Sequence, residues 1–320
     1  MSASGDPHPT GPGQLQEVSE RVYAYVQPDG TWWINNMGML AGRSRTIAID
    51  SSSTVQRTEE FRTAIATTTS APLSTLINTH HHGDHTNGNF LFPEATIVAH
   101  EECRRLIVQD GSDGIKNLQK SGIWANPDGG PDWGDIQAAP PFLTYLNGVN
   151  LYVDELLCEV RYIGTPAHTT NDSIIWIPDR QVLFSGDLLF NGGTPFLLMG
   201  SVSGAIEAVS SLRRYPVRTI VPGHGPVCGP EVIDQVLAYL TFVMNLATHG
   251  HADGIAPLEL ARDTDLGEFA ALSDPERIVG NLHRAYLELG GAARGAPIDG
   301  AAALSDMITY NGGKPLTCLA

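Results

Sequence analysis

One short segment of the chain, THHHGDHTNGN, constrains the fold more than any other part of the sequence. It brings together four side chains that can bind metal ions: His80, His82, Asp84 and His85. The apolar run before it, at residues 73–78, predicts a buried strand. Two histidines separated by one residue leave an extended chain on the same face, and the glycine that follows them allows a sharp turn. The segment therefore predicts that one peptide supplies ligands to two neighbouring metal ions.

Three further candidate ligands lie later in the chain, each at the end of a run typical of a strand. They are His168 in GTPAHTTND, Asp187 in QVLFSGDLLF and His224 in VPGHGPV. The order and local sequences of all seven residues resemble the ligand signature of the metallo-β-lactamase superfamily. This resemblance extends from Arg21 to about Gly229.

The resemblance implies a fold and a division of the ligands. The fold is α/β, a four-layer αββα sandwich that holds its metals between two β-sheets, here with a helical C-terminal extension. One metal would be held by His80, His82 and His168, the other by Asp84, His85 and His224, with Asp187 bridging the two. Nitrogen and oxygen ligands without sulfur suit two zinc ions, although iron or manganese also fit. We expect Asp84 and Asp187 to be the catalytic carboxylates.

The two ends of the chain are expected to differ from its middle. Residues 1–15 have no apolar periodicity, which predicts a disordered tail, and residues 16–320 are expected to form a single domain. The part from about residue 230 to 320 is the expected helical extension. Helices are predicted at residues 59–68, 101–109, 205–212, 230–248, 257–264 and 275–289. The last begins at Ser-Asp-Pro-Glu, which is typical of a helix start.

The net charge of −16 argues against nucleic acid and anionic membranes as partners, since both would repel the chain. The first residues lack the basic start and apolar run of a signal peptide, so we expect a cytoplasmic protein. The four cysteines are scattered and form no CxxC pair, which makes disulfides and sulfur ligands unexpected.

Aromatic and flexible apolar side chains are expected to form the walls of a substrate pocket. The TWWI sequence at residues 31–34 predicts a strand over the metal site, with Trp32 and Trp33 on opposite faces, so that at most one faces substrate. Packing of both in the sheet is an equal alternative. An irregular loop expected at residues 110–141 contributes Trp124, and the TPFLLM sequence contributes Phe196 and Met199.

Two other histidines are expected to have structural roles. His81 should point away from the histidines on either side of it in an extended chain. His100 ends another predicted strand and belongs to no ligand motif.

The expected centre suits attack on a carbonyl group. Two neighbouring divalent cations activate a shared water and polarise a carbonyl oxygen, which serves hydrolysis of an ester, thioester or lactam and also an aldol-type ring closure. The phrases QPDGTWWINN, GNFLFPEATIVAH and NGGTPFLLMGS further resemble an actinobacterial branch of the superfamily. That branch contains second-ring cyclases and thioesterases of aromatic (type II) polyketide pathways of the actinorhodin type. The resemblance implies a cyclase or thioesterase that acts on an aromatic polyketide intermediate.

Several alternatives stay open at this stage. A metal-dependent hydrolase of another lactone, thioester or lactam would share every ligand. A glyoxalase-type thioesterase usually has a basic C-terminal region, and residues 257–290 contain no lysine. The small-molecule substrate would be free or delivered by an acyl carrier protein, for which residues 213, 214 and 218 form the one evident arginine cluster. A homodimer is compatible with the sequence. A scaffold that binds metal without catalysis usually lacks ligands, and all seven are present.

Overall fold

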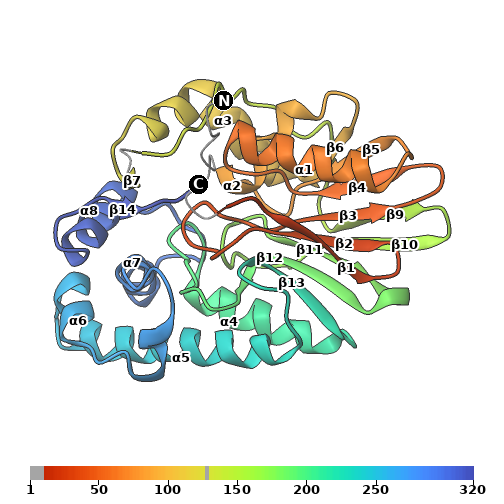
Figure 1. Cartoon of the computed structure of the whole chain (residues 1–320). Helices are drawn as coiled ribbons and strands as arrows, with labels where there is room; N and C mark the ends of the chain where they lie inside the picture. The colour runs from red at the N-terminus through yellow and green to blue at the C-terminus, as the bar shows by residue number, and fades with distance from the viewer. Residues whose placement is uncertain (1–10, 127–129) are drawn as a thin grey trace.

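The computed structural model describes residues 11–126 and 130–320, and its strands form two large sheets and one small one (Figure 1). The first sheet has the order β1-β2-β3-β4-β5-β6-β8, with β1 (Gln14–Ser19), β2 (Val22–Val26), β3 (Met37–Ala41), β4 (Thr46–Ile49), β5 (Leu73–Ile77), β6 (Thr96–His100) and β8 (Leu143–Tyr145). The second has the order β13-β12-β11-β10-β9, with β9 (Gly148–Val153), β10 (Leu156–Tyr162), β11 (Ser173–Ile177), β12 (Val182–Phe190) and β13 (Thr219–His224). The small sheet pairs β7 (Trp124–Ala125) with β14 (Leu316–Thr317).

Helices cover the outer face of each large sheet. Figure 1 shows α1 and α3 above the first sheet, α4 and α5 below the second, and α6 to α8 gathered at one side. Their bounds are α1 (Val55–Thr68), α2 (Gly83–Thr86), α3 (Glu101–Gln119), α4 (Val202–Ser211), α5 (Glu231–Ala252), α6 (Pro257–Asp263), α7 (Arg277–Leu289) and α8 (Gly300–Tyr310). No helix in the described ranges has both the length and the apolar character that crossing a membrane requires.

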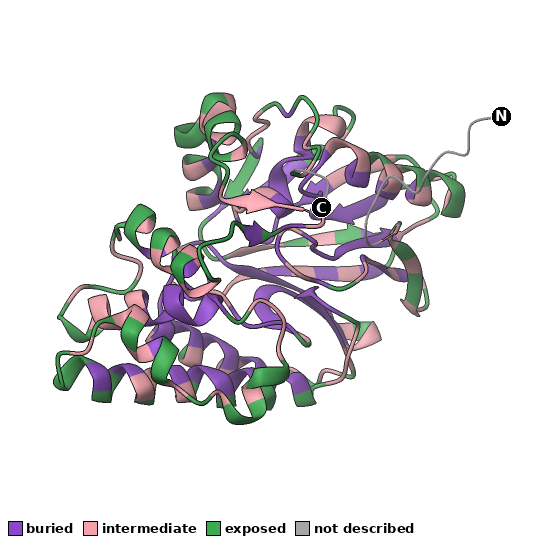
Figure 2. Cartoon of the chain, turned by 60° about the vertical axis from the view of Figure 1, so that its left-hand side comes forward, coloured by how far each residue is buried: buried purple, intermediate pink, exposed green. Residues whose placement is uncertain are grey.

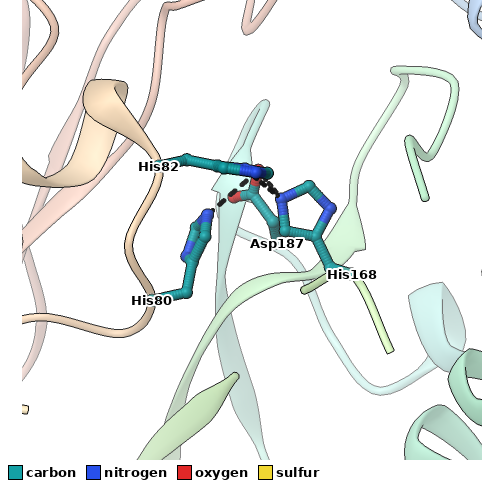
Figure 3. A group of neighbouring side chains, drawn as sticks. All are labelled: His80, His82, His168 and Asp187. Atoms are coloured by element: carbon teal, nitrogen blue, oxygen red, sulfur yellow. Dashed lines mark hydrogen bonds and ion pairs between the residues drawn. The ribbon is translucent and has the colours of Figure 1, made fainter. Parts of the chain in front are cut away.

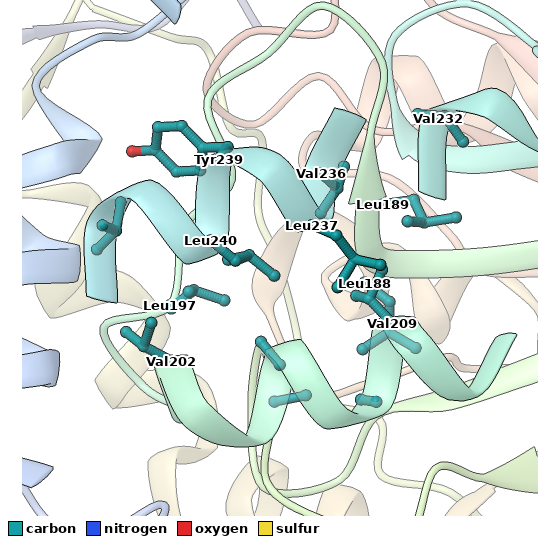
Figure 4. Close-up of a cluster of buried hydrophobic side chains, with 14 of the residues drawn as sticks. Leu188, Leu189, Leu197, Val202, Val209, Val232, Val236, Leu237, Tyr239 and Leu240 are labelled. Carbon is teal, nitrogen blue, oxygen red and sulfur yellow. The ribbon is translucent and has the colours of Figure 1, made fainter. Parts of the chain in front are cut away.

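Three apolar layers join these elements into the expected αββα sandwich. Phe61 and Ile65 on α1 are buried in a cluster with side chains of the first sheet. A second cluster lies between the two sheets, where Leu40 of β3 and Val160 of β10 are both fully buried. The third joins the second sheet to α4 and α5, and Figure 4 shows Leu188 and the neighbouring apolar side chains at that layer. The four-layer prediction is confirmed, including the helical C-terminal region.

The strand β12 lies in the middle of this sandwich. All nine of its residues are buried, because both faces of the second sheet are covered (Figure 2). It pairs in parallel with β13, and β4 pairs in parallel with β5 in the other sheet. The segment that follows β5 and the residues of β12 and β13 near their carboxyl ends meet where the two sheets face each other, and this region carries the predicted ligands.

The strand predicted at the TWWI sequence is wrong. Residues 31–36 form turns and irregular chain between β2 and β3, and β3 begins only at Met37. Trp33 has a φ of 67°, in the left-handed region that a continuing strand does not allow. The alternation of faces expected for Trp32 and Trp33 therefore does not apply.

Several helix bounds also differ from the prediction. The helix α1 begins at Val55 instead of residue 59, because the hydroxyl of Thr54 accepts the Arg57 N–H as an N-cap. The helix α3 continues to Gln119 across a break at Gly111, so the first part of the expected loop at residues 110–141 is helical. The helix α7 begins at Arg277, two residues after the predicted start at residue 275.

Both ends of the described chain pair with other strands. The strand β1 includes Gln14 and Leu15, which were expected in the tail, and pairs them with β2. Residues 1–10 lie outside the described residues. At the other end, β14 pairs in parallel with β7, and Cys318 is fully buried beyond it.

Candidate metal centre

The seven predicted ligands meet in two groups that share one residue. The first group is His80, His82, His168 and Asp187, and the second is Asp84, His85, His224 and Asp187. Within each group the candidate ligand atoms lie within 4.8 Å of one another. Figure 3 shows the first group, with two histidines entering from the segment after β5 and the other two side chains from the second half of the chain.

Asp187 lies between the histidines of the two groups. Its Oδ2 atom is 3.3 Å from Nε2 of His168 and 3.3 Å from Nε2 of His224. Its Oδ1 atom is 3.0 Å from Nε2 of His85. Asp84 contributes a second carboxylate, with Oδ2 at 3.1 Å from Nε2 of His224. The carboxylate of Asp187, which belongs to both groups, lies where it can contact two cations at once.

The unpaired nitrogen atoms of the site fit a pair of bound metal ions. Nε2 of His80 is buried and has no hydrogen-bond partner among the described residues. Nε2 of His168 and Nδ1 of His82 lie 2.8 Å apart, so two ring nitrogens face the same point. Buried polar atoms normally have partners, and convergent imidazole nitrogens beside carboxylates are typical of metal ligands. The cluster therefore fits a dinuclear metal site.

Partners behind the ligands orient the imidazole rings. Nδ1 of His85 lies 2.8 Å from Oδ2 of Asp50, and Nδ1 of His168 lies 2.5 Å from the carbonyl oxygen of Phe196. Asp50 also accepts the backbone N–H and the hydroxyl of Thr79, each at 2.8 Å. A partner on the remote ring nitrogen directs the other nitrogen into the site.

Burial and neighbouring charges shift the pKa values of the ligand side chains. Burial lowers the pKa of His80 well below its usual value. Burial also opposes protonation of His85, but Asp187 and Asp50 outweigh it and raise the pKa of this histidine well above its usual value. Burial would raise the pKa of Asp187, yet the surrounding histidines hold it well below its usual value. The carboxylate of Asp187 is therefore ionised, as a metal ligand must be.

Gly223 provides the space that Asp187 occupies. A Cβ atom at this position would lie 1.9 Å from Oδ1 of Asp187. Since real Cβ atoms do not approach an oxygen so closely, any larger residue here would displace the carboxylate. The Gly-His-Gly sequence thus has a packing role in addition to carrying His224.

A cavity of about 290 Å³ opens onto the metal centre. All five predicted wall residues line it: Trp32, Trp33, Trp124, Phe196 and Met199. Their aromatic rings pack edge to face, with centroids 4.9 Å apart for Trp32 and Phe196 and 5.1 Å apart for Trp33 and Trp124. Because both tryptophans face the cavity, the expectation that at most one would do so is wrong.

The cavity wall also contains a cation that the sequence did not predict. Arg277, at the start of α7, lines the cavity, and its guanidinium lies 4.1 Å from the ring centroid of Trp32. Its terminal nitrogens contact the carbonyl oxygen of Thr194 at 2.9 Å and the carboxylate of Asp274 at 2.8 Å. The neighbouring Glu276 accepts the indole N–H of Trp32 at 2.6 Å. These contacts attach α7 to the aromatic wall.

The remaining sequence candidates lie outside the two ligand groups. Nδ1 of His81 is 3.0 Å from the side-chain amide nitrogen of Asn171, and its ring lines the cavity instead of pointing away from it. Nε2 of His100 lies 3.0 Å from the carbonyl oxygen of Leu146, a structural contact. Of the proposed carrier-docking arginines, Arg213 pairs with Asp234.

Sequence reasoning missed Asp50, Glu276 and Arg277. Asp50 had a usable signal, since it ends the TIAID run that predicts a strand, just as Asp187 lies in a similar run. The two residues at the start of α7 had none, because their approach to Trp32 depends on how α7 packs on the rest of the fold.

Comparison with known proteins identifies the family. Residues 30–224 match the family described as the metallo-beta-lactamase superfamily, which covers more than half of the chain. The chain belongs to the metallo-β-lactamase superfamily. It is accordingly an enzyme of a superfamily of metal-dependent hydrolases, and its metal-site residues lie within or at the edge of the matched range.

Among curated relatives, a hydroxyacylglutathione hydrolase from Rhodospirillum rubrum is 26% identical over 185 residues, which span 58% of this chain and 57% of that protein. An acyl-coenzyme A thioesterase, MBLAC2, from Homo sapiens is 25% identical over 231 residues, spanning 63% of this chain and 81% of the relative. The chain thus spans little more than half the length of the first of these relatives.

Solved structures agree on the fold. A metallo-beta-lactamase from Pontibacter korlensis superposes with a TM-score of 0.57 at 20% identity, covering 72% of this chain and 99% of that one. The structure of TMB-1 gives a TM-score of 0.56 at 18% identity, with 72% and 98% covered. Most of the uncovered part of this chain is therefore additional to the shared fold.

Proposed function

We propose that this enzyme is a dinuclear zinc-dependent thioesterase that acts on the thioester of a flat, largely apolar acyl group, with an aromatic polyketide intermediate as its substrate. His80, His82 and His168 would hold one ion, Asp84, His85 and His224 the other, and Asp187 would contact both. When bound, the two ions would activate water and polarise the carbonyl that is attacked. The same polarisation would favour ring closure of a poly-β-ketone.

The observation that carries the proposal is the aromatic cavity beside Asp187, the carboxylate that belongs to both ligand groups. Trp32, Trp33, Trp124 and Phe196 present ring faces and edges next to the ligands. Such walls orient a flat acyl group and exclude water from around the reacting carbonyl. The names of the two curated relatives, both thioester hydrolases, support the same reaction type.

The charges of the cavity argue against substrates that carry a carboxylate near the reacting bond. Arg277 is the only lysine or arginine among the described residues of the lining, and its terminal nitrogens are already engaged by Thr194 and Asp274. A β-lactam or a glutathione thioester needs a cationic partner for its carboxylates. We therefore assign these two classes as poor substrates.

Asp84 and Asp187 are the carboxylates to which we assign catalytic roles. His85 and His224 lower the pKa of Asp84 against the effect of its burial, so this carboxylate is ionised near neutral pH and is available to a bound cation. Asp187 positions the histidines of both groups around one point. Neither role requires a nucleophilic serine or cysteine.

A substrate comparison tests the proposal directly. Purified enzyme, loaded with zinc, would be assayed under identical conditions with an aryl thioester of N-acetylcysteamine, a poly-β-ketone thioester, S-lactoylglutathione and nitrocefin. We expect kcat/KM to be highest for the first two. Faster turnover of nitrocefin or S-lactoylglutathione would overturn the substrate assignment. The Asp187→Ala variant, which we expect to lack activity, serves as the background control.

A further inference from the structure

A second cavity adjoins the first on the side away from α7. Its volume is about 270 Å³, and it lies between α3, the chain at residues 138–139 and the histidine-rich segment. We name it the distal chamber and define it by the residues that only it contacts, chiefly Ile107, Ile115, Gln119 and Ala138. Neither the ligand groups nor the proposed chemistry accounts for it.

The distal chamber shares part of its wall with the metal cavity. Five residues line both spaces: Trp33, His81, Gly83, Asp110 and Leu118. Trp33 belongs to this shared wall, and its ring is packed so closely on Gly83 that a Cβ atom there would lie 2.9 Å from Cζ3 of the tryptophan. Trp124 and Trp133 hold the same ring edge to face, at centroid distances of 5.1 Å and 4.8 Å. A ligand that passes this ring would occupy both spaces.

The lining of the chamber disfavours anionic ligands. Among the described residues, it contains no lysine or arginine, and Asp110 contributes a carboxylate. An anionic group such as a phosphate or a second carboxylate would therefore be repelled and left without a partner. The side chains of Ile107, Ile115 and Ala138 provide apolar surface instead.

Two hydrogen-bond donors in the lining lack partners among the described residues: the indole nitrogen of Trp33 and the side-chain amide nitrogen of Gln119. Both nitrogen atoms are buried. A buried donor in this state is costly unless a ligand supplies an acceptor. An oxygen atom on an otherwise apolar ligand would meet this requirement.

We propose that the distal chamber binds the far end of the acyl group, and that it takes an uncharged aromatic group of about two fused rings bearing a hydrogen-bond acceptor. An apolar cavity of about 150 Å³ holds one benzene ring, so a cavity of this size has room for roughly twice as much. The proposal rests on the proposed function in one respect: the thioester carbonyl of the same molecule lies at the metal centre. It adds that residues of α3, away from the metal ligands, determine how large an acyl group the enzyme accepts.

Filling the chamber tests this assignment. Ala138→Phe and, independently, Ile115→Trp would each place a ring inside it, whereas Gln137→Phe adds the same ring to an exposed neighbour and is the matched control. With S-(2-naphthoyl)-N-acetylcysteamine, we expect both filling variants to lower kcat/KM by about 10- to 100-fold, mainly through KM. With the S-acetyl analogue, and in the control variant, the change should stay within about twofold.

Binding without turnover separates this proposal from the proposed function. Calorimetry with 2-acetylnaphthalene, an uncharged probe that cannot be hydrolysed as a thioester, should show binding to the wild type and loss of binding in both filling variants. If no thioester is hydrolysed but the probe binding behaves in this way, the proposed function fails and the chamber assignment stands. If the filling variants fold, and bind the probe and hydrolyse both thioesters as the wild type does, the chamber assignment is overturned.

Discussion

Replacing Asp50 by asparagine should weaken metal binding without changing a single ligand. The carboxylate of Asp50 accepts two hydrogen bonds from Thr79 and contacts Nδ1 of His85 at 2.8 Å. The residue has a φ of 58°, and asparagine adopts this left-handed conformation readily, so the backbone should be preserved. The substitution thus removes the charge behind His85 and replaces one of the two acceptor oxygens, both of which have partners, by an NH2 group that cannot accept a hydrogen bond.

The size of the effect follows from the contact that is lost. A hydrogen bond to a charged group contributes about 1.5–3 kcal/mol, which corresponds to about 10- to 150-fold in an equilibrium constant. Removal of a partner behind a ligating histidine typically weakens metal affinity by about 10- to 100-fold. We therefore expect a loss within this range for the ion held by the Asp84, His85 and His224 group, and a smaller loss for the other.

The assay is a competition titration of zinc against a chromogenic chelator, with the melting temperature of each metal-free protein measured in parallel. Asp154→Asn is the matched control, because Asp154 also has a left-handed backbone, with a φ of 55°, and accepts hydrogen bonds only from residues outside the centre. If Asp50→Asn binds both ions within about twofold of the wild type, the proposed role of Asp50 is refuted.

Three further predictions concern the centre and the fold. Asp187→Ala should reduce bound metal from about two ions per chain to less than one, because this carboxylate belongs to both ligand groups; elemental analysis that finds two ions would contradict the assignment. Gly223→Ala should also reduce metal content, since its Cβ atom would displace the Asp187 carboxylate, whereas Gly300→Ala, where a Cβ atom meets open space, should not; equal metal content in the two variants would refute the packing argument. Hydrogen bonds, of which the one from the Arg43 N–H has the largest effect, lower the pKa of Asp154 to about 2. The contribution of this carboxylate to the free energy of unfolding is therefore complete above its unfolded-state pKa of about 4, and it is lost as the pH falls toward 2. Thermal unfolding at pH 5 and pH 3 should therefore show a smaller acid-induced drop in Asp154→Asn than in the wild type, and an equal drop would contradict the contribution.

The ligand set was predictable because its signal is local. The spacing of His80, His82, Asp84 and His85 after a strand, and the strand-like runs around Asp187 and His224, place each side chain near the carboxyl end of a strand. Parallel strands bring those ends together. The sandwich followed from the family resemblance of the same segments.

The errors arose where tertiary contacts override local patterns. The TWWI sequence has strand-forming residues, but Trp32 is held by Glu276 and Arg277, and Trp33 by two other tryptophans. These partners lie far from the two tryptophans in the sequence, and no local sequence pattern predicts the contacts. The helical continuation of α3 was hidden for a different reason, because Gly111 interrupts the pattern while the helix resumes beyond it.

The order of the ligands along the chain has a consequence for biosynthesis. During translation, the histidine-rich peptide leaves the ribosome long before His168, Asp187 and His224 have been made. A nascent chain therefore exposes an incomplete chelating peptide, and neither group is complete until the second sheet has been synthesised and has docked on the first. Metal taken up early would occupy a partial site, and such an ion would hold ligands that belong to two different groups. High-affinity metal binding thus indicates that both halves of the sandwich have assembled. Refolding should therefore give more active enzyme when zinc is added after the protein has folded than when zinc is present from the start.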